Sequence, residues 1–307
     1  MEFEALSHWE RLPEGVSLHE TPGVAVDEKD RVYVLTRNTE NPILVFEPDG
    51  SFRTMFGKGT FSARAHGIVV GPDGMIYATD DGTGTITKWS PEGRLLMTIG
   101  TPNQQAPRWS GLPFSRPTQS AVSHRTGHIF ISDGYANARV HKYAPDGTHV
   151  LSWGEPGIDP GQFMIPHNIA IDPDDNIYVA DREAHRVQVF DAEGGLQAIW
   201  NNIHRPCGLT VGPDRNIYIG ELNGVGLVED CEGYGHRIEV FSPAGELLAR
   251  YGDAEEGEGP GQFIAPHGIA VDSAGDIYVG EVSYTIRGQH LDPPRELRSL
   301  CKIRRVS

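Results

Sequence analysis

Short apolar stretches with a period of two alternate along the chain with turns rich in Gly, Asp and Pro. One unit recurs: an apolar strand, a turn of the DPDG type, a second strand built on Ile-Tyr or a similar pair, and two further strands. The aromatic residue of the second strand recurs every 40 to 60 residues, at Tyr33, Tyr77, Phe130, Tyr178, Tyr218 and Tyr278. Such alternation between Asp-Gly turns predicts β-hairpins, and four strands per unit are typical of a β-propeller blade.

Six units fit the 307 residues, so the sequence predicts an all-β, six-bladed propeller that forms a single domain over residues 1–307. The sixth unit, which starts at Pro266, has only three strands, and the last of them lies near residues 300–304. The segment 3–12 precedes the first unit and belongs to none. We expect it to close the ring as the outer strand of the last blade, because closure removes unpaired strand edges.

The charge balance narrows the possible partners. The chain has 42 acidic and 26 basic residues, a net charge of −16, which argues against nucleic acid and anionic membrane surfaces. It has no apolar stretch of the ~20 residues that span a bilayer, and residues 1–13 lack the features of a signal peptide. Its three cysteines are too few for a disulfide framework. We therefore expect a cytoplasmic protein that binds neither nucleic acid nor membranes.

One position in each unit, at the start of the first strand, points toward the central axis of a propeller. We call it the ring position, and its residues are Pro22, His66, Thr118, His167, Cys207 and His267. The histidines occupy alternate blades, which lie about 120° apart in a six-bladed ring. A single histidine is more often an ordinary polar residue, but three in register predict a metal site. Three neutral imidazoles with an open fourth position suit catalytic Zn²⁺, whereas calcium prefers oxygen ligands.

The second strands end at the same face of the disc as the ring position, because neighbouring strands are antiparallel. An acidic residue ends the second strand in five blades and either accepts backbone N–H groups or orients the histidines. The sequence does not separate these two roles for Asp80, Asp133, Asp181, Glu221 and Glu281.

Three other polar residues fall beside the predicted metal site. Arg37 and Arg182 form either surface salt bridges or a clamp for a small substrate that carries a carboxylate or an amide. Tyr135 is either a packing residue or a general base whose pKa a nearby cation and two arginines would bring below ~10. For Cys207, a small buried residue is favoured over a fourth metal-facing group.

Several motifs give the chain a resemblance to a known family. SDGYANAR at 132–139, the run from Trp153 to His167 with PGQF at its centre, and VADRE at 179–183 resemble peptidyl-α-hydroxyglycine α-amidating lyases, which are NHL-repeat propellers. The resemblance covers all six units and is weakest in the fifth. It implies that His66, His167 and His267 bind zinc, that Tyr135 is the catalytic base, and that Arg37 and Arg182 line the substrate site. The implied reaction splits a hydroxylated C–N centre into an amide and glyoxylate.

The chain departs from this family at several positions. The carbonyls of Val24 and Ile68 could contribute to the family's calcium site, but Gly268 stands where the family has an aspartate, so the resemblance does not support Ca²⁺ here. Ala265 replaces a methionine of the pocket wall. Ala136 replaces a family cysteine, and the loss of that disulfide fits a reducing compartment. We therefore expect a small carbinolamide-like substrate, not a peptide-hormone precursor.

Two other functions are compatible with the sequence. A metal-dependent propeller hydrolase of the lactonase or esterase type would draw on Glu221 and Glu281, and a non-catalytic NHL scaffold would need no metal. The Gly-rich, acidic insertion 223–236 is either a lid or a long variable loop, and the loop is favoured.

Overall fold

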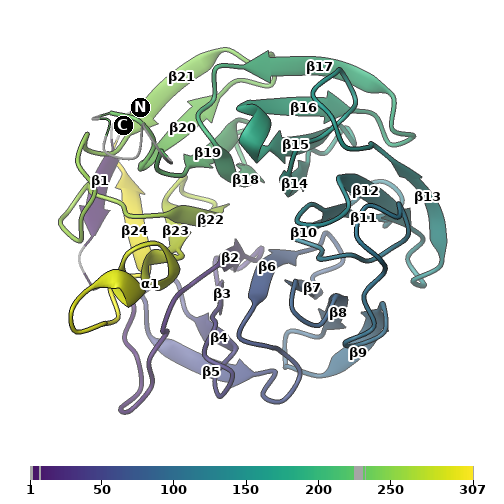
Figure 1. Ribbon diagram of the computed structural model, residues 1–307. Coiled ribbons are helices and arrows are strands. Elements are labelled where there is room, and N and C mark those ends of the chain that lie inside the picture. The colour runs from purple at the N-terminus through teal and green to yellow at the C-terminus, as the bar shows by residue number, and fades with distance from the viewer. Residues whose placement is uncertain (1–2, 7, 225–230, 232, 307) are drawn as a thin grey trace.

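The computed structural model describes residues 3–6, 8–224, 231 and 233–306, which form six four-stranded antiparallel sheets around a central axis (Figure 1). Blade one contains β2 (Gly23–Val26), β3 (Val32–Leu35), β4 (Ile43–Phe46) and β5 (Phe52–Phe56). Blade two contains β6 (Ala65–Val70), β7 (Ile76–Asp80), β8 (Thr85–Trp89) and β9 (Leu95–Ile99). Blade three contains β10 (Gln119–Val122), β11 (Ile129–Asp133), β12 (Arg139–Tyr143) and β13 (His149–Trp153).

The remaining three blades repeat this order. Blade four contains β14 (Pro166–Ile171), β15 (Ile177–Asp181), β16 (Arg186–Phe190) and β17 (Leu196–Asn201). Blade five contains β18 (Pro206–Val211), β19 (Ile217–Glu221), β20 (Arg237–Phe241) and β21 (Leu247–Tyr251). Blade six contains β22 (Pro266–Val271), β23 (Ile277–Glu281), β24 (Leu300–Arg305) and, from the other end of the chain, β1 (Phe3–Leu6).

The ring closes as the sequence predicts. Strand β1 pairs antiparallel with β24, in a register that runs from Phe3 opposite Arg305 to Leu6 opposite Lys302. Trp9 follows β1 and packs between Phe46 of blade one and Tyr278 of blade six. The predicted six-bladed propeller and its closure by the N-terminal strand are therefore confirmed.

The recurring tyrosine of the second strand explains the repeat. Its ring is buried between blades, and its hydroxyl donates to an aspartate of the preceding turn: Tyr33 to Asp27, Tyr77 to Asp73, Tyr178 to Asp172, Tyr218 to Asp214 and Tyr278 to Asp272. The same aspartate accepts backbone N–H groups of its turn, as Asp27 does from Lys29 and Arg31. Each Asp–Tyr pair thus ties a turn to its strand and satisfies a buried hydroxyl.

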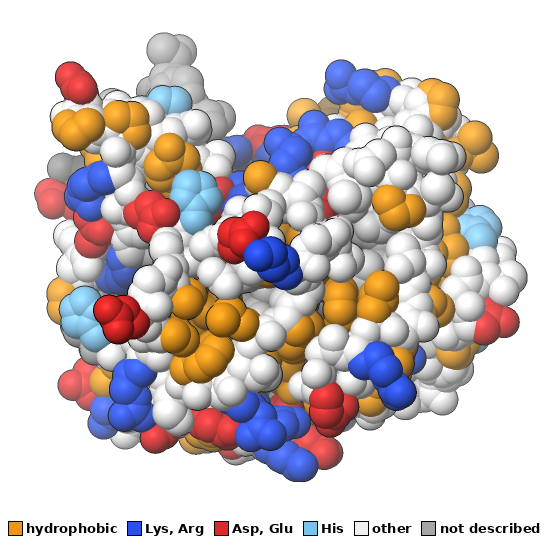
Figure 2. Space-filling model, turned by 90° about the horizontal axis from the view of Figure 1, so that it is seen from below, with side chains coloured by type: hydrophobic (Ala, Val, Ile, Leu, Met, Phe, Trp, Pro, Cys, Tyr) orange, Lys and Arg blue, Asp and Glu red, His pale blue; other side chains and the backbone are white. Residues whose placement is uncertain are grey.

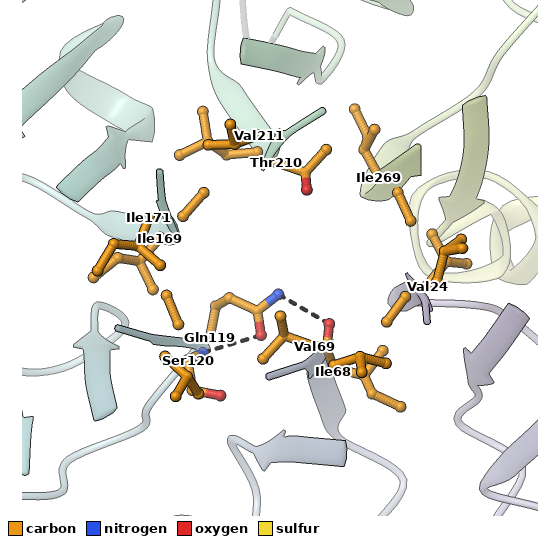
Figure 3. A pocket seen from close by; sticks show the side chains of 18 of the residues that line it. Val24, Ile68, Val69, Gln119, Ser120, Ile169, Ile171, Thr210, Val211 and Ile269 are labelled. Carbon is orange, nitrogen blue, oxygen red and sulfur yellow. Dashed lines mark hydrogen bonds between the residues drawn. The ribbon is translucent and has the colours of Figure 1, made fainter. Parts of the chain in front are cut away.

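The first strands of the blades line a central channel. Beyond the ring position, aliphatic side chains and the polar residues Gln119 and Thr210 enclose a cavity of about 210 Å³ (Figure 3). We call the opposite end, where first strands begin and second strands end, the channel mouth. That face lies at the top in Figure 2, where the surface is hollowed and Lys or Arg side chains gather.

Helical structure is sparse in the described residues. It comprises η1 (Arg182–Ala184), α1 (Ser283–Ile286) and η3 (Gly288–His290). None of these helices is long and apolar enough to cross a membrane. Half of the predicted variable loop 223–236, namely residues 225–230 and 232, lies outside the described residues.

Candidate metal centre

The three ring-position histidines sit at β-bulges. In blade two the pairing of β6 with β7 passes from Ala65 to Gly67, so His66 has no partner on β7. The same irregularity leaves out His167 in β14 and His267 in β22. A bulge turns the extra residue away from the alternation of the strand, and here each bulged residue is a buried histidine.

The three imidazoles converge at the axis. Their ring centroids are 4.8 Å apart for His66 and His167, 4.6 Å for His66 and His267, and 4.8 Å for His167 and His267. One nitrogen from each ring lies within 4.8 Å of the other two. The structure thus brings together side chains that are about a hundred residues apart in the sequence, in an arrangement that could hold one metal ion.

Backbone carbonyls of the intervening blades fix the orientation of each ring. Nδ1 of His66 lies 2.6 Å from the Thr118 carbonyl, Nδ1 of His167 lies 3.1 Å from that of Cys207, and Nδ1 of His267 lies 2.6 Å from that of Pro22. A carbonyl only accepts, so each Nδ1 carries the proton and each Nε2 keeps its lone pair. All six ring positions therefore contribute: three supply imidazoles, and three supply the carbonyls that orient them.

Electrostatics keep these rings neutral. Burial lowers the pKa of all three histidines well below 6.5. The positive charges of Arg37 and Arg182 add to the effect for His66 and His267. Neutral imidazoles with inward lone pairs are the form that binds a transition metal, so the donor set fits a zinc ion.

Tyr135 reaches this cluster from the segment after β11. Its phenol oxygen lies 3.0 Å from Nε2 of His66 and 2.9 Å from Nε2 of His167. Arg182 donates to the same oxygen from Nη1 at 3.3 Å. In the chain without a cation, burial raises the pKa of Tyr135, and the charges of Arg182 and Arg37 oppose this without overcoming it. The arginines alone therefore do not give the lowered pKa that the sequence predicts.

Arg37 and Arg182 are each held in place by a carboxylate. Arg37 contacts Glu20 at 2.5 Å and donates to the Ala65 carbonyl, directly before His66. Arg182 contacts Glu183 at 2.7 Å and stacks over the ring of Tyr135. Both guanidiniums are largely buried and lie close enough to influence the histidines. Neither is an isolated surface salt bridge.

The acidic residues at the ends of the second strands hold the backbone. Asp181 accepts from the N–H groups of Met164 and Ile165, and Glu281 accepts from those of Ile264 and Ala265. The equivalent bonds join Asp80 to Ser62, Asp133 to Ser115 and Glu221 to His204. Each carboxylate thus fixes the segment that leads into the first strand of its own blade. Of the two roles considered from the sequence, the structure supports the one in which backbone N–H groups are bound.

Cys207 lies beside one imidazole. Its sulfur is 3.5 Å from Nδ1 of His167, and burial raises the pKa of the thiol to about 12. A neutral, fully buried thiol agrees with the favoured interpretation of a small packing residue. All three cysteines, Cys207, Cys231 and Cys301, are free.

Val24 and Ile68, whose carbonyls were considered as calcium ligands, lie along the wall of the central channel, beyond the ring position (Figure 3). The Ile68 carbonyl accepts from the side-chain amide of Gln119 at 3.4 Å. A Cβ at Gly268 would lie 2.6 Å from Cα of Gly23 and 2.9 Å from the nitrogen of Val24. The approach of β22 to β2 thus leaves no room for an aspartate at this position.

Sequence reasoning missed a second group of charges at the mouth. Arg64 and Arg116 both bind Asp81, which is fully buried, and Arg116 also stacks over the ring of Tyr135 at 4.9 Å. Both arginines stand two residues before the ring position, as does Arg205 in blade five. An alignment of the blades at that position contains the signal that would have found them.

Comparisons with known proteins agree with this architecture. The model of the NHL repeat family matches residues 163–190. Peptidylglycine alpha-amidating monooxygenase of Rattus norvegicus is 31% identical over 253 residues, which are 79% of this chain and 25% of that protein. The chain thus spans about a quarter of that relative. Peptidyl-alpha-hydroxyglycine alpha-amidating lyase 1 of Drosophila melanogaster is 29% identical over 266 residues, 80% of this chain and 47% of that protein.

A further relative matches over most of its own length, and a solved structure shares the fold. NHL repeat-containing protein 3 of Homo sapiens is 32% identical over 286 residues, 84% of this chain and 76% of that protein. A streptogramin B lyase structure superposes with a TM-score of 0.62 at 17% identity, over 98% of this chain and 96% of that one. The chain therefore belongs to the NHL-repeat family of six-bladed β-propellers and resembles the peptidyl-α-hydroxyglycine α-amidating lyases.

Proposed function

We propose that the protein is a zinc-dependent lyase that cleaves a hydroxylated C–N centre of the α-hydroxyglycine type into an amide and glyoxylate. The observation that carries the proposal is the contact of the Tyr135 hydroxyl with Nε2 of both His66 and His167. It joins a candidate base to a candidate metal site. The Drosophila melanogaster relative, which is named an amidating lyase, supports the same reaction class.

The reaction balances within the substrate. The hydroxyl loses its proton, the C–N bond breaks with its electron pair going to nitrogen, and the nitrogen gains a proton. Tyr135 is the group positioned to take the first proton and to return it to the nitrogen. The Nη1 of Arg182, 3.3 Å from the Tyr135 oxygen, is suited to hold the substrate carboxylate next to the reacting carbon.

The residues that would hold the metal are His66, His167 and His267. When bound there, zinc supplies a Lewis-acidic positive charge that favours the loss of a proton from the neighbouring hydroxyl groups. The protein supplies neutral donors, the carbonyls that orient them, and burial that keeps bulk water from competing.

The contacts at the mouth favour this function over a lactonase-type hydrolase. Glu221 and Glu281 would be ligands in such an enzyme. Each is fully buried and already engaged, Glu221 with Arg237 and Glu281 with Arg298 and two backbone N–H groups. The free thiols are consistent with a reducing compartment, which is the basis for proposing the cytoplasm as the location.

The test is a product assay with purified, zinc-loaded protein. α-Hydroxyhippurate is offered beside a panel of lactones, and glyoxylate, amide and ring-opened acids are measured separately. Equimolar glyoxylate and benzamide, together with about one zinc per chain by elemental analysis, are expected. Ring-opened acids without glyoxylate would indicate a hydrolase instead. Protein without metal and without turnover would indicate a binding scaffold.

A further inference from the structure

Three ion-paired groups of arginines lie around Tyr135 and the ring position, although the whole chain is strongly acidic. In these groups five guanidiniums share three carboxylates. Arg37 pairs with Glu20, whereas two arginines share each of the other two carboxylates: Arg182 and Arg205 on Glu183, and Arg64 and Arg116 on Asp81. Within these three groups the positive charges outnumber the negative charges by two. Two separate positive charges around one small site are complementary to a ligand with two separate negative charges.

The second of these groups, which we call the arginine clasp, consists of Arg64, Arg116 and Asp81. Asp81 is fully buried and binds Arg116 through two bonds, Nε to Oδ1 at 2.6 Å and Nη2 to Oδ2 at 3.0 Å. It also binds Nη2 of Arg64. This anchoring leaves Nη1 of Arg116, and Nε and Nη1 of Arg64, without a hydrogen-bond partner among the described residues. The clasp therefore offers preorganised donors to an anion.

Exposure separates the clasp from the arginines beside the reacting centre. The side chains of Arg64 and Arg116 are 52% and 36% exposed, against 12% for Arg182. Arg182 donates a hydrogen bond to the phenol oxygen of Tyr135, whereas Arg116 lies over the phenol ring and makes no hydrogen bond to that oxygen. A carboxylate one bond from the carbinol carbon would meet Arg182. A group that meets the clasp must belong to the outer, acyl end of the substrate.

We infer that the substrate is a dianion, in which the arginine clasp binds a second carboxylate carried by the acyl group of an N-acyl-α-hydroxyglycine. This inference rests on the proposed function for the identity of the inner half of the ligand. The clasp itself is a binding site for a carboxylate, and it acts on affinity without taking part in bond cleavage.

The test uses two unreactive ligands that differ at one end. N-succinylglycine ends in a carboxylate where N-butyrylglycine ends in a methyl group, and neither carries the hydroxyl that the reaction needs. Titration calorimetry with the zinc-loaded full chain measures both dissociation constants at low salt. We expect N-succinylglycine to bind at least tenfold more tightly, which corresponds to about 1.4 kcal/mol. The preference should shrink in high salt, because the clasp is partly exposed.

The double variant Arg64→Gln, Arg116→Gln should reduce the preference to less than threefold. Arg53→Gln removes an arginine of similar exposure on the outer strand β5 and should leave the preference intact. Equal affinity for the two ligands in the parent protein, including no binding of either, would overturn the inference. So would an undiminished preference in the double variant. Binding is measured with ligands that do not react, so the two proposals can fail separately. A preference for N-succinylglycine, together with no glyoxylate from α-hydroxyhippurate, would refute the proposed function but not the binding role of the arginine clasp.

Discussion

The phenol oxygen of Tyr135 lies 2.9 Å from Nε2 of His167, so a residue of blade three contacts the ring-position residue of blade four. Nδ1 of the same imidazole is occupied by the Cys207 carbonyl of blade five. The lone pair of Nε2 therefore faces Tyr135 and the two other histidines. A cation held by the three rings would lie directly beside the phenol, and this proximity is the basis of the first two predictions.

Replacing Tyr135 by Phe should abolish most of the activity and leave the metal in place. The variant loses only the hydroxyl that contacts His66 and His167, so the rings keep their carbonyl partners. A general base contributes about 10²–10⁴-fold to a rate, and a fall in kcat of that size is expected with little change in KM. Glyoxylate assays and elemental analysis of the same preparation measure the two effects. A variant that works at the parent rate would remove Tyr135 from the mechanism.

Replacing His167 by Asn should abolish zinc binding. In the parent protein, zinc at about a hundred times its Kd should stabilise the fold by about 2.7 kcal/mol, a rise in Tm of roughly 4–8 °C. The variant should show no rise. His124→Asn, at an exposed histidine in the turn between β10 and β11, should behave as the parent does. Equal zinc-induced shifts in His167→Asn and the parent would mean that the metal binds elsewhere.

Much of this site could be predicted, because equivalent positions of the repeat occupy equivalent places in each blade. Once the blades are aligned on the tyrosine of the second strand, His66, His167 and His267 fall at one position, and the closed ring brings them to the axis. Closure itself was predictable, because the sixth unit lacked a strand and residues 3–6 had no other place.

The partners of the site residues could not be predicted, because they depend on contacts between blades. The repeat does not reveal that the Pro22 carbonyl meets His267, or that Asp81 and Arg116, on different blades, meet over Tyr135. The sequence also did not show that, without a cation, the cost of burying the Tyr135 phenolate exceeds the benefit of the neighbouring guanidiniums and raises the pKa of Tyr135. The prediction of a lowered pKa beside a bound cation stays a prediction.

Replacing Arg182 by Lys should slow the reaction although the charge is kept. The guanidinium contacts Glu183, reaches the phenol oxygen of Tyr135 and stacks on its ring. A single ammonium cannot make all three contacts. We expect kcat/KM to fall by about 10–100-fold at unchanged zinc content. Steady-state kinetics measure this effect. The control is Arg186→Lys, at a buried arginine that pairs with Asp181 on the same blade. It tests whether any buried Arg-to-Lys change has the same consequence.

Stability should fall in acid partly because of His204. This ring packs against His185 and Tyr234, and burial lowers its pKa to about 4. Between pH 6.5 and pH 4, His204 therefore binds a proton in the unfolded chain but not in the folded chain. The free energy of unfolding falls by up to about 1.4 kcal/mol per pH unit over this range. His204→Phe keeps the ring contacts without the titration. Urea unfolding at pH 7.5 and pH 5 should show the variant gaining roughly 2 kcal/mol on the parent, and a constant difference would refute this.

The close approach of blades six and one at Gly268 should exclude a calcium site. A Cβ there would lie 2.6 Å from Cα of Gly23 and 3.0 Å from the Pro22 carbonyl, which is the carbonyl that orients His267. Gly268→Ala should therefore cost about 1–3 kcal/mol through overpacking and weaken zinc binding by displacing Pro22. Gly268→Asp should be less stable still, because it adds a buried carboxylate. Thermal unfolding of both variants and of the parent, with and without millimolar Ca²⁺, checks this. Stabilisation of Gly268→Asp by Ca²⁺ would contradict this prediction, because it would require β22 and β2 to move apart and make room for the carboxylate.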